Sequence, residues 1–281
     1  MKKIFSIIFL IFPVIFSCTN PKLIKSESCK ITSRHGAIIE EWFLLYDNNG
    51  REIKNKRYRL DDHYYWDRST GYNSDGTISE IIDYQKDGTV YQTVKLEYDG
   101  GRCFKDSTYD NKNKLIRYSV YKWPTALSEI CFNYNSQGEL LGRQESIFNS
   151  GGRVLKISFF NSKGYLYGEK DFSYEKDFSH PVTIINRYKQ KSEKQQYLLN
   201  ASGNVIRELR YVNNKILSEI IYEYDFNNNL ITYKGFKSGI MDGSKHFTYR
   251  DDNVNLVESF TLRDHDDKIL EAAEFKYEFY N

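Results

Sequence analysis

Residues 72–78 read YNSDGTI, in which an aromatic residue precedes Asn, a Gly closes a short polar cluster, and an aliphatic residue follows. The same order recurs as YDNNGREI from residue 46, YNSQGEL from 134, FNSGGRV from 148, FNSKGYL from 160 and LNASGNV from 199. Asn or Asp followed by Gly adopts the positive φ of a tight hairpin turn at low cost. The repeat therefore predicts a chain of β-hairpins. Positive φ is expected at the glycines that end these turns: Gly76, Gly138, Gly152 and Gly203.

Turn-like clusters follow one another at a mean step of about 13 residues between residues 50 and 268. Between the turns, apolar and polar residues alternate, as in residues 90–98, where Leu96 points one way and Lys95 the other. Alternation with period two is typical of antiparallel strands with one apolar and one wet face. No helical stripe occurs after Gly36, which lies outside the repeat, so replacing Gly36 by valine should matter less than replacing a repeat glycine. The pattern predicts about nineteen strands.

The size of such a sheet limits its shape. About nineteen strands would make an open sheet roughly 90 Å wide, whereas twisted open sheets rarely exceed about ten strands. One face would also expose far more Tyr, Phe, Leu and Ile than a soluble monomer tolerates. The sequence therefore predicts an all-β fold over residues 37–281, a long antiparallel meander curled into a closed, spiral or two-layered sheet with an aromatic interior.

The first residues indicate export. Lys2 and Lys3 precede an apolar run over residues 4–16, which is typical of a signal peptide and too short for a membrane-spanning helix. We therefore expect a signal peptide over residues 1–17 and a polar tether over residues 18–36.

The end of the signal, Ile15-Phe16-Ser17-Cys18, resembles the lipobox of bacterial lipoproteins, although Phe16 is bulkier than the usual residue. The resemblance implies diacylglycerol on the Cys18 sulfur, cleavage before Cys18, and membrane lipid as a partner. The alternative is plain secretion with an ordinary Cys18. Thr19 is not the Asp that often retains lipoproteins at the inner membrane, so an outer-membrane or cell-surface location in the envelope is favoured.

The repeated unit Tyr-Asp/Asn-x-x-Gly-x-aliphatic resembles the YD repeat of Rhs-type shell proteins and, more loosely, the MORN-like repeats of bacterial lipoproteins. The resemblance covers most of residues 40–281 and implies an extended, meandering β-sheet. Long Rhs proteins encapsulate a toxin, but this chain is too short to enclose one and carries no toxin domain.

Composition excludes some partners. Without the two signal lysines the chain has 38 basic and 38 acidic residues, so no electrostatic reason exists to expect nucleic acid. Apart from Cys18, the cysteines are Cys29, Cys103 and Cys131, an odd number that excludes a disulfide framework. A strand predicted between Cys103 and Cys131 would separate them by about 9.6 Å, beyond the 7 Å that a disulfide allows, so we expect no bridge there.

Aromatic residues at alternating positions are expected to fill the interior. Two groups break the alternation and are predicted to place large rings on both faces, which makes them the candidate binding surface: Tyr64, Tyr65, Trp66, Tyr121 and Trp123.

The sequence contains no convincing motif for a metal site or a catalytic site. Asp61-Asp62-His63 and the cluster at residues 264–267 lie where the repeat demands polar turns, and His35, His180 and His246 have no ligand-like spacing. No nucleophile, P-loop or dinucleotide-binding motif occurs. We therefore expect no metal, no cofactor and no enzymatic activity.

Three functional hypotheses remain. The leading one is a membrane-anchored, exported lipoprotein whose repetitive β domain binds an unknown protein or glycan, or acts as a structural spacer at the envelope. The second is an envelope carbohydrate-binding or carbohydrate-processing protein that uses an aromatic groove. An outer-membrane barrel is disfavoured, because the strands are short for spanning and a lipobox marks a peripheral protein.

Overall fold

The computed structural model describes residues 23–60, 64–175, 180–188, 191–250 and 256–279. These residues form twenty antiparallel strands in a single sheet. None of the described segments forms a helix with the length and apolarity needed to cross a membrane.

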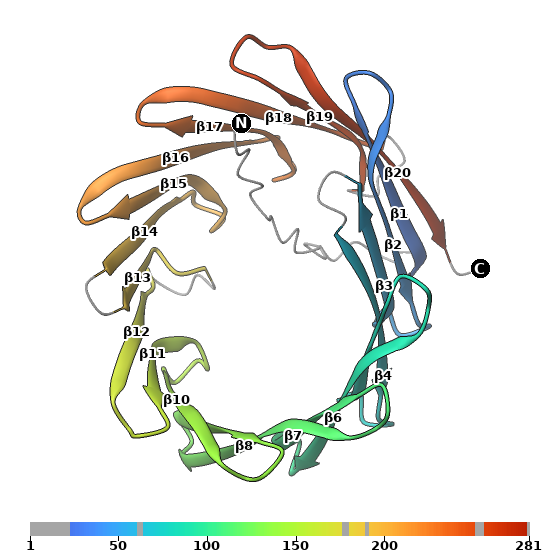
Figure 1. The fold of residues 1–281 in the computed structure, drawn as a ribbon. Helices are drawn as coiled ribbons and strands as arrows, with labels where there is room; N and C mark the ends of the chain where they lie inside the picture. Colours follow the sequence, from blue (N-terminus) through green and yellow to red (C-terminus); the bar gives the residue numbers. More distant parts are fainter. Residues whose placement is uncertain (1–22, 61–63, 176–179, 189–190, 251–255, 280–281) are drawn as a thin grey trace.

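The strands follow one another in chain order around a ring (Figure 1). Their bounds are β1 (Ile24–Ser33), β2 (Ile38–Tyr46), β3 (Glu52–Arg59), β4 (Tyr65–Tyr72), β5 (Ile78–Tyr84), β6 (Val90–Asp99), β7 (Arg102–Asp110), β8 (Leu115–Thr125), β9 (Ser128–Asn135), β10 (Leu140–Phe148), β11 (Val154–Asn161), β12 (Leu166–Ser173), β13 (Thr183–Tyr188), β14 (Lys191–Leu199), β15 (Val205–Val212), β16 (Lys215–Tyr224), β17 (Leu230–Lys237), β18 (Ile240–Tyr249), β19 (Val257–Arg263) and β20 (Ile269–Phe279).

Pairing between the first and last strands closes the ring into a barrel. β1 pairs with both β2 and β20, so that Cys29 lies opposite Trp42 on one side and Phe275 on the other. The predicted all-β antiparallel meander is confirmed, and of the three predicted shapes the chain adopts the closed one. A closed sheet has no unpaired edge strand, which removes the main aggregation hazard of a long meander.

The count of strands differs from the prediction by one, at β1. Residues 24–33 lie in the segment expected to be a polar tether, and they form a strand instead. The segment IKSESCKITS has few apolar residues, but Cys29 and Ile31 share the face that packs against Trp42, Phe260 and Phe275. This segment becomes a strand because it pairs with the edges of β2 and β20, rather than because its own sequence strongly favours a strand.

The repeat motif forms tight turns with an αL residue at their end. In the turn at residues 73–76, the Gly76 amide donates to the Asn73 carbonyl, and Gly76 has φ 88°. The positive φ expected at the repeat glycines is confirmed, with values of 88°, 83°, 76° and 82° at Gly76, Gly138, Gly152 and Gly203. Gly36, outside the repeat, also has a positive φ of 78° and ends the turn between β1 and β2, so the strain argument applies to it as well.

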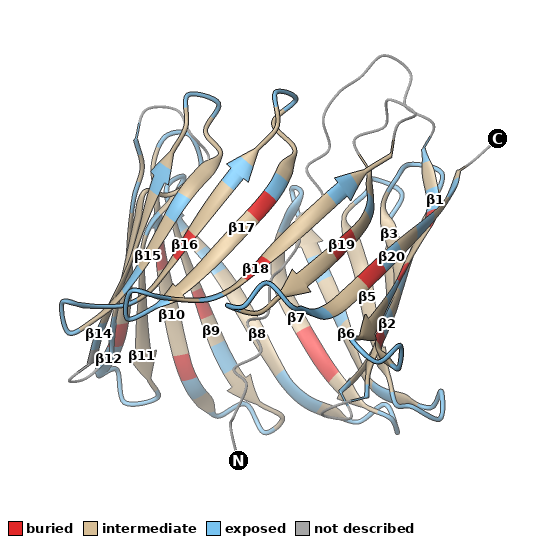
Figure 2. Cartoon of the chain, turned by 90° about the horizontal axis from the view of Figure 1, so that it is seen from above, coloured by how far each residue is buried: buried red, intermediate tan, exposed pale blue. Residues whose placement is uncertain are grey.

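The barrel has two different rims. The turns that follow even-numbered strands, the first residue of β1 and the end of β20 lie at one rim, which we call the N-terminal rim, and the turns after odd-numbered strands form the opposite rim. Figure 2 shows the strands running between these rims. Twenty strands tilted by roughly 40° give a ring about 40 Å across and about 23 Å high, wide enough to leave an open lumen.

Side chains along each strand alternate between the lumen and the exterior. Among the described residues, the buried apolar side chains are few, and three of them form one cluster at the closure, Cys29, Phe260 and Ala273, while Cys131 and Ile220 lie elsewhere on the wall. A single-layered barrel of this width has no solid core, so each wall is stabilised by contacts between neighbouring strands.

The exterior carries ion pairs around the barrel. The pairs on this face join neighbouring strands or nearby residues of one strand: Lys30–Glu41, Lys54–Asp67, Lys105–Glu97, Arg143–Glu145, Lys156–Glu169, Arg187–Asp171, Arg207–Glu219 and Lys234–Glu223. They lie within strands rather than in turns, so charged side chains interrupt the apolar ones along the described exterior.

The cysteines test the order of the strands. Cys103 lies on β7 and Cys131 on β9, with β8 paired between them. Cys29, Cys103 and Cys131 are all free thiols. The chain between Cys103 and Cys131 stays in the sheet, as the simple meander predicts.

Candidate binding site

Two adjoining hollows lie on the lumenal wall over β5 to β10. The first, of about 510 Å³, is lined by Leu96, Asp106, Ser119 and Asn133 among others. The second, of about 490 Å³, lies toward the N-terminal rim, and its lining is Leu96, Arg102, Cys103, Tyr121, Trp123, Ala126, Glu129, Phe148 and Gly152. Leu96 borders both hollows, so together they form one trough, which we call the β5–β10 trough.

Tyr121 and Trp123 form an aromatic platform in this trough. Both lie on β8 two residues apart, so they share a face, and their ring centroids are 6.5 Å apart with planes inclined by 19°. The guanidinium of Arg102 lies 5.6 Å from the centroid of the Trp123 ring. Flat rings side by side, flanked by a cation, can stack on the apolar face of a sugar or on another ring.

Polar groups beside the platform form a hydrogen-bonded cluster. The Tyr121 hydroxyl donates to Asp106 Oδ2 at 2.7 Å. Ser119 Oγ lies 3.3 Å from Asp106 Oδ1 and 3.2 Å from Asn133 Oδ1. Burial, reinforced by the Asp106 carboxylate, raises the pKa of Tyr121, so its phenol stays protonated and remains a donor. The trough thus combines an aromatic platform with a fixed set of acceptors.

The wall opposite the trough carries a ladder of aromatic rings through the closure. Neighbouring ring centroids lie 5.6 to 6.3 Å apart along the series Tyr222, Tyr233, Phe247, Phe260, Phe275 and Trp42. Lys245 Nζ lies 3.3 Å from the centroid of the Phe260 ring. Burial lowers the pKa of Lys245 to about 8, although the Glu271 and Glu40 carboxylates favour the ammonium. This wall therefore has more ring-to-ring contacts than the wall that carries the trough, and it includes the buried cluster of Cys29, Phe260 and Ala273.

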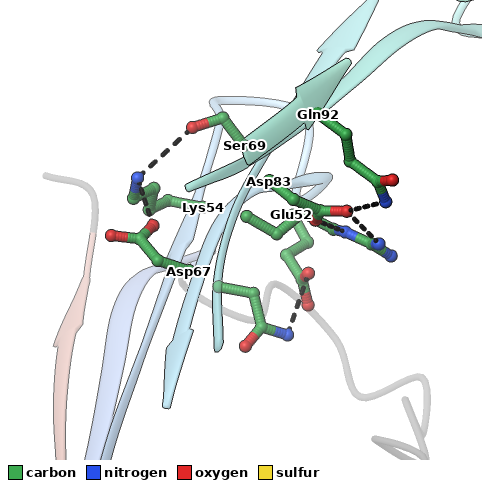
Figure 3. A network of polar contacts seen from close by, with 8 residues as sticks. Glu52, Lys54, Asp67, Ser69, Asp83 and Gln92 are labelled. Atoms are coloured by element: carbon green, nitrogen blue, oxygen red, sulfur yellow. Dashed lines mark hydrogen bonds and ion pairs between the residues drawn. The ribbon is translucent and has the colours of Figure 1, made fainter. Parts of the chain in front are cut away.

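A second polar network lies on the wall at β4, β5 and β6. Arg68 Nε donates to Asp83 Oδ1 at 2.7 Å, and Gln92 Nε2 donates to Asp83 Oδ2 at 2.8 Å. Burial alone would raise the pKa of Asp83, but the hydrogen bonds from Arg68 and Gln92 lower it overall. Figure 3 shows this network on one side of the sheet and the Lys54–Asp67 pair on the other. Both oxygens of the Asp83 carboxylate therefore accept hydrogen bonds from neighbouring strands, so this residue stabilises the wall rather than binding a ligand.

The first predicted aromatic group places its rings on both faces, as expected. Trp66 faces the lumen, where the Arg68 guanidinium lies 4.2 Å from its ring centroid. Tyr64, just before β4, is 39% exposed. Tyr65 faces the exterior, and its hydroxyl donates to Asp67 at 3.0 Å.

The second predicted group differs from the expectation. Tyr121 and Trp123 do not divide between the faces, because residues two apart on a regular strand point the same way. The two groups lie on β4 and β8, with three strands between them and near opposite rims, so they do not form one surface. The structure adds Arg102, Asp106 and Asn133 to the site. No local sequence signal marks these three, because strand pairing brings Asp106 to Tyr121, Arg102 to Trp123 and Asn133 to Ser119.

The structure describes only some of the remaining predicted residues. Cys18 and the cluster at residues 61–63 lie outside the described residues. Asp264 follows β19, and its Oδ1 accepts hydrogen bonds from the amides of Asp266 and Lys268 at 2.9 Å each, as a polar turn requires. In the described ranges, no group of three or more His, Cys, Asp and Glu side chains is placed to hold a metal ion.

No protein-family model and no curated protein matches the chain. Among solved structures, it is similar to a porin-like protein from Bacteroides uniformis, with TM-score 0.40 and 11% identity over 92% of this chain and 100% of that one. It is similar to a porin-like protein from Bacteroides vulgatus, with TM-score 0.33 and 12% identity over 91% and 98% of the two chains. A third structure, TcdB2-TccC3-TEV, gives TM-score 0.38 and 12% identity over 87% of this chain, which spans only 15% of that chain.

Proposed function

We propose that this chain is a lipoprotein of the cell envelope, anchored through acyl chains on Cys18, whose water-facing barrel binds a ligand in its lumen. The observation that carries this proposal is the charged exterior, with ion pairs such as Lys54–Asp67 and Lys234–Glu223 within the strands. An Arg or Lys at the lipid-facing midplane of a barrel costs about 2–4 kcal/mol. A barrel with this exterior belongs beside a membrane rather than in it.

Solubility without detergent tests whether the exterior of the barrel faces water. Residues 19–281, made without the signal and without Cys18, should remain monodisperse in buffer with neither detergent nor lipid. Size-exclusion chromatography with light scattering measures this. A chain that stays soluble only in detergent micelles would show that the exterior faces lipid, and the proposal would fail.

The anchor is tested separately. A palmitate analogue fed to cells should label the full chain, and Cys18→Ser should abolish the label and release the protein from membranes. Ser17→Ala is the matched control, because it keeps a small residue before the cysteine. Labelling that survives Cys18→Ser would refute the lipoprotein assignment. Fractionation of the labelled membranes should place the protein in the outer membrane or at the cell surface, since Thr19 follows the cysteine.

A second candidate function is carbohydrate binding in the β5–β10 trough, without catalysis. The Tyr121–Trp123 platform favours it, because pyranose rings stack on aromatic faces while their hydroxyls need acceptors such as Asp106. Envelope glycan fractions titrated into the soluble barrel should change tryptophan fluorescence. Trp123→Ala should abolish binding, and Tyr65→Ala on the exterior should not. Capture of a protein partner instead of a glycan, or cleavage of the glycan, would decide against this candidate.

A further inference from the structure

Phe226 occupies an unusual place for an aromatic residue. It is 94% exposed in the turn between β16 and β17, on the N-terminal rim. Asp225 Oδ1 accepts the amides of Asn227 and Asn229 at 2.9 and 2.8 Å, so the turn is held without help from the Phe226 side chain. At the same position, the other turns of this type on this rim carry small or polar residues: Asn48, Ser74, Ser150 and Ala201. Turn geometry therefore does not account for the phenylalanine.

Two leucines are exposed on the same rim. Leu127 lies in the turn between β8 and β9 and is 43% exposed. Leu23 is 44% exposed, and a Cβ atom on Gly50 would lie 3.5 Å from its Cδ2, so Leu23 rests at the turn between β2 and β3. Eight strands separate Leu23 from Leu127, eight separate Leu127 from Phe226, and four lead back to β1. The three side chains are thus spread around the ring and define a plane across its mouth.

The anchor limits what can lie against this plane. Five residues join Cys18 to Leu23, and a fully extended chain spans at most about 3.6 Å per residue, or roughly 18 Å. The opposite rim lies about 23 Å further along the barrel axis. A barrel acylated at Cys18 therefore keeps its N-terminal rim close to the bilayer, and the bilayer is a flat apolar surface of the kind that three spread apolar side chains fit.

Charge gives the contact little further specificity. Arg51 at this rim is paired with Asp47 at 2.7 Å, and Arg102 lies against Trp123. Because Arg51 and Arg102 already have partners in the protein, neither needs an anionic headgroup to balance its charge. A vesicle of zwitterionic lipid is therefore a sufficient surface for the test.

We propose that the N-terminal rim rests on the lipid surface through Phe226, Leu127 and Leu23, which holds the barrel upright on the membrane. This inference depends on the proposed acylation of Cys18. The lumen then lies along the membrane normal, with the Tyr121–Trp123 platform toward the bilayer and the opposite mouth open to the aqueous side. A ligand enters the trough from that opposite mouth.

The test places a single fluorescent label on each rim of the full acylated chain. Phe226→Cys and Ile240→Cys are each made with Cys103→Ser, labelled with a polarity-sensitive fluorophore and reconstituted in phosphatidylcholine vesicles. Ile240 is the matched control, because it is 73% exposed beside a turn of the opposite rim. The label at 226 should shift to the blue and lose at least half of its emission to brominated lipid. The label at 240 should be quenched by aqueous iodide instead.

Vesicle flotation distinguishes a failure of the Cys18 anchor from a failure of the rim contact. Protein that floats with the vesicles while iodide quenches both labels equally would show that the anchor exists and the rim contact does not. Quenching of both labels by brominated lipid would show a barrel lying on its side or embedded, and would overturn the upright arrangement. Protein that does not float would refute the anchor and the rim contact together.

Discussion

The Tyr224 hydroxyl donates a hydrogen bond to the backbone carbonyl of Val205, 2.7 Å away. Tyr224 ends β16 and Val205 begins β15, beside the register shift that follows the preceding turn. The same bond recurs on the N-terminal rim at 2.8 to 2.9 Å, from Tyr72 to Glu52, from Tyr249 to Leu230 and from Tyr277 to Val257. These four tyrosines, all near the ends of even-numbered strands, therefore hold the start of the preceding strand in place.

Replacing one of these tyrosines should destabilise the barrel measurably. Tyr224→Phe keeps the ring but leaves the Val205 carbonyl without this donor, so we expect a loss of about 1 kcal/mol in the free energy of unfolding. Urea unfolding monitored by circular dichroism measures it. Tyr165→Phe is the control, because Tyr165 is 68% exposed. Equal stability of the two variants would show that the Tyr224 bond contributes nothing net.

Two glycines within strands should respond differently to the same substitution. A Cβ atom at Gly142 would lie 2.6 Å from the Phe160 carbonyl oxygen, a backbone atom that cannot move alone. At Gly168 the clash is with the ring of Tyr188, which is 38% exposed and can rotate away. Gly142→Ala should cost about 1–3 kcal/mol and Gly168→Ala clearly less. The same urea titration decides this, and the reverse order would contradict the register between β10 and β11.

The closure should weaken as the pH rises. Burial raises the pKa of Glu27 on β1 to about 7, although the neighbouring Tyr277 and Tyr46 hydroxyls lower it. Because the folded barrel favours the protonated acid, its contribution is fully present below about pH 4.5 and is lost as the pH rises through about 7. Glu27→Gln should remove this fall. Melting temperatures between pH 4.5 and 8 measure it for both proteins, and identical slopes would sink the assignment.

The barrel should require its first strand. A chain that starts at residue 34 lacks β1, so β2 and β20 are left as unpaired edges. Such edges template pairing with other chains, so we expect dimers or aggregates where a chain starting at residue 22 stays monomeric. Light scattering at equal concentration distinguishes the two. A monomeric truncated chain would mean that β2 and β20 can pair directly.

Some of this architecture was predictable because its causes are local. The turns follow from Asn, Asp and Gly within four residues, and the strands between them from alternation, so the positive φ at Gly76 and the all-β fold could be inferred. β1 could not be predicted, because Glu27, Ser28 and Lys30 mask the alternation of apolar and polar residues. Its strand structure depends on pairing with β2 and β20. The polar neighbours of the platform could not be predicted for the same reason: Asp106 reaches Tyr121, and Asn133 reaches Ser119, only through the pairing of β7, β8 and β9.

The closure also orders the events of folding. Every strand pairing joins consecutive strands except that of β1 with β20, where Thr32 and Ala272 meet across 240 residues of chain. Hairpins with short loops form in microseconds, whereas joining distant ends adds a loop-closure entropy that grows slowly with chain length. The sheet can therefore form hairpin by hairpin as the chain is synthesised, but its first strand can complete its pairing only when its last strand is present. Until residue 279 is delivered, the nascent sheet exposes two open edges, and this interval is when a chaperone is most needed.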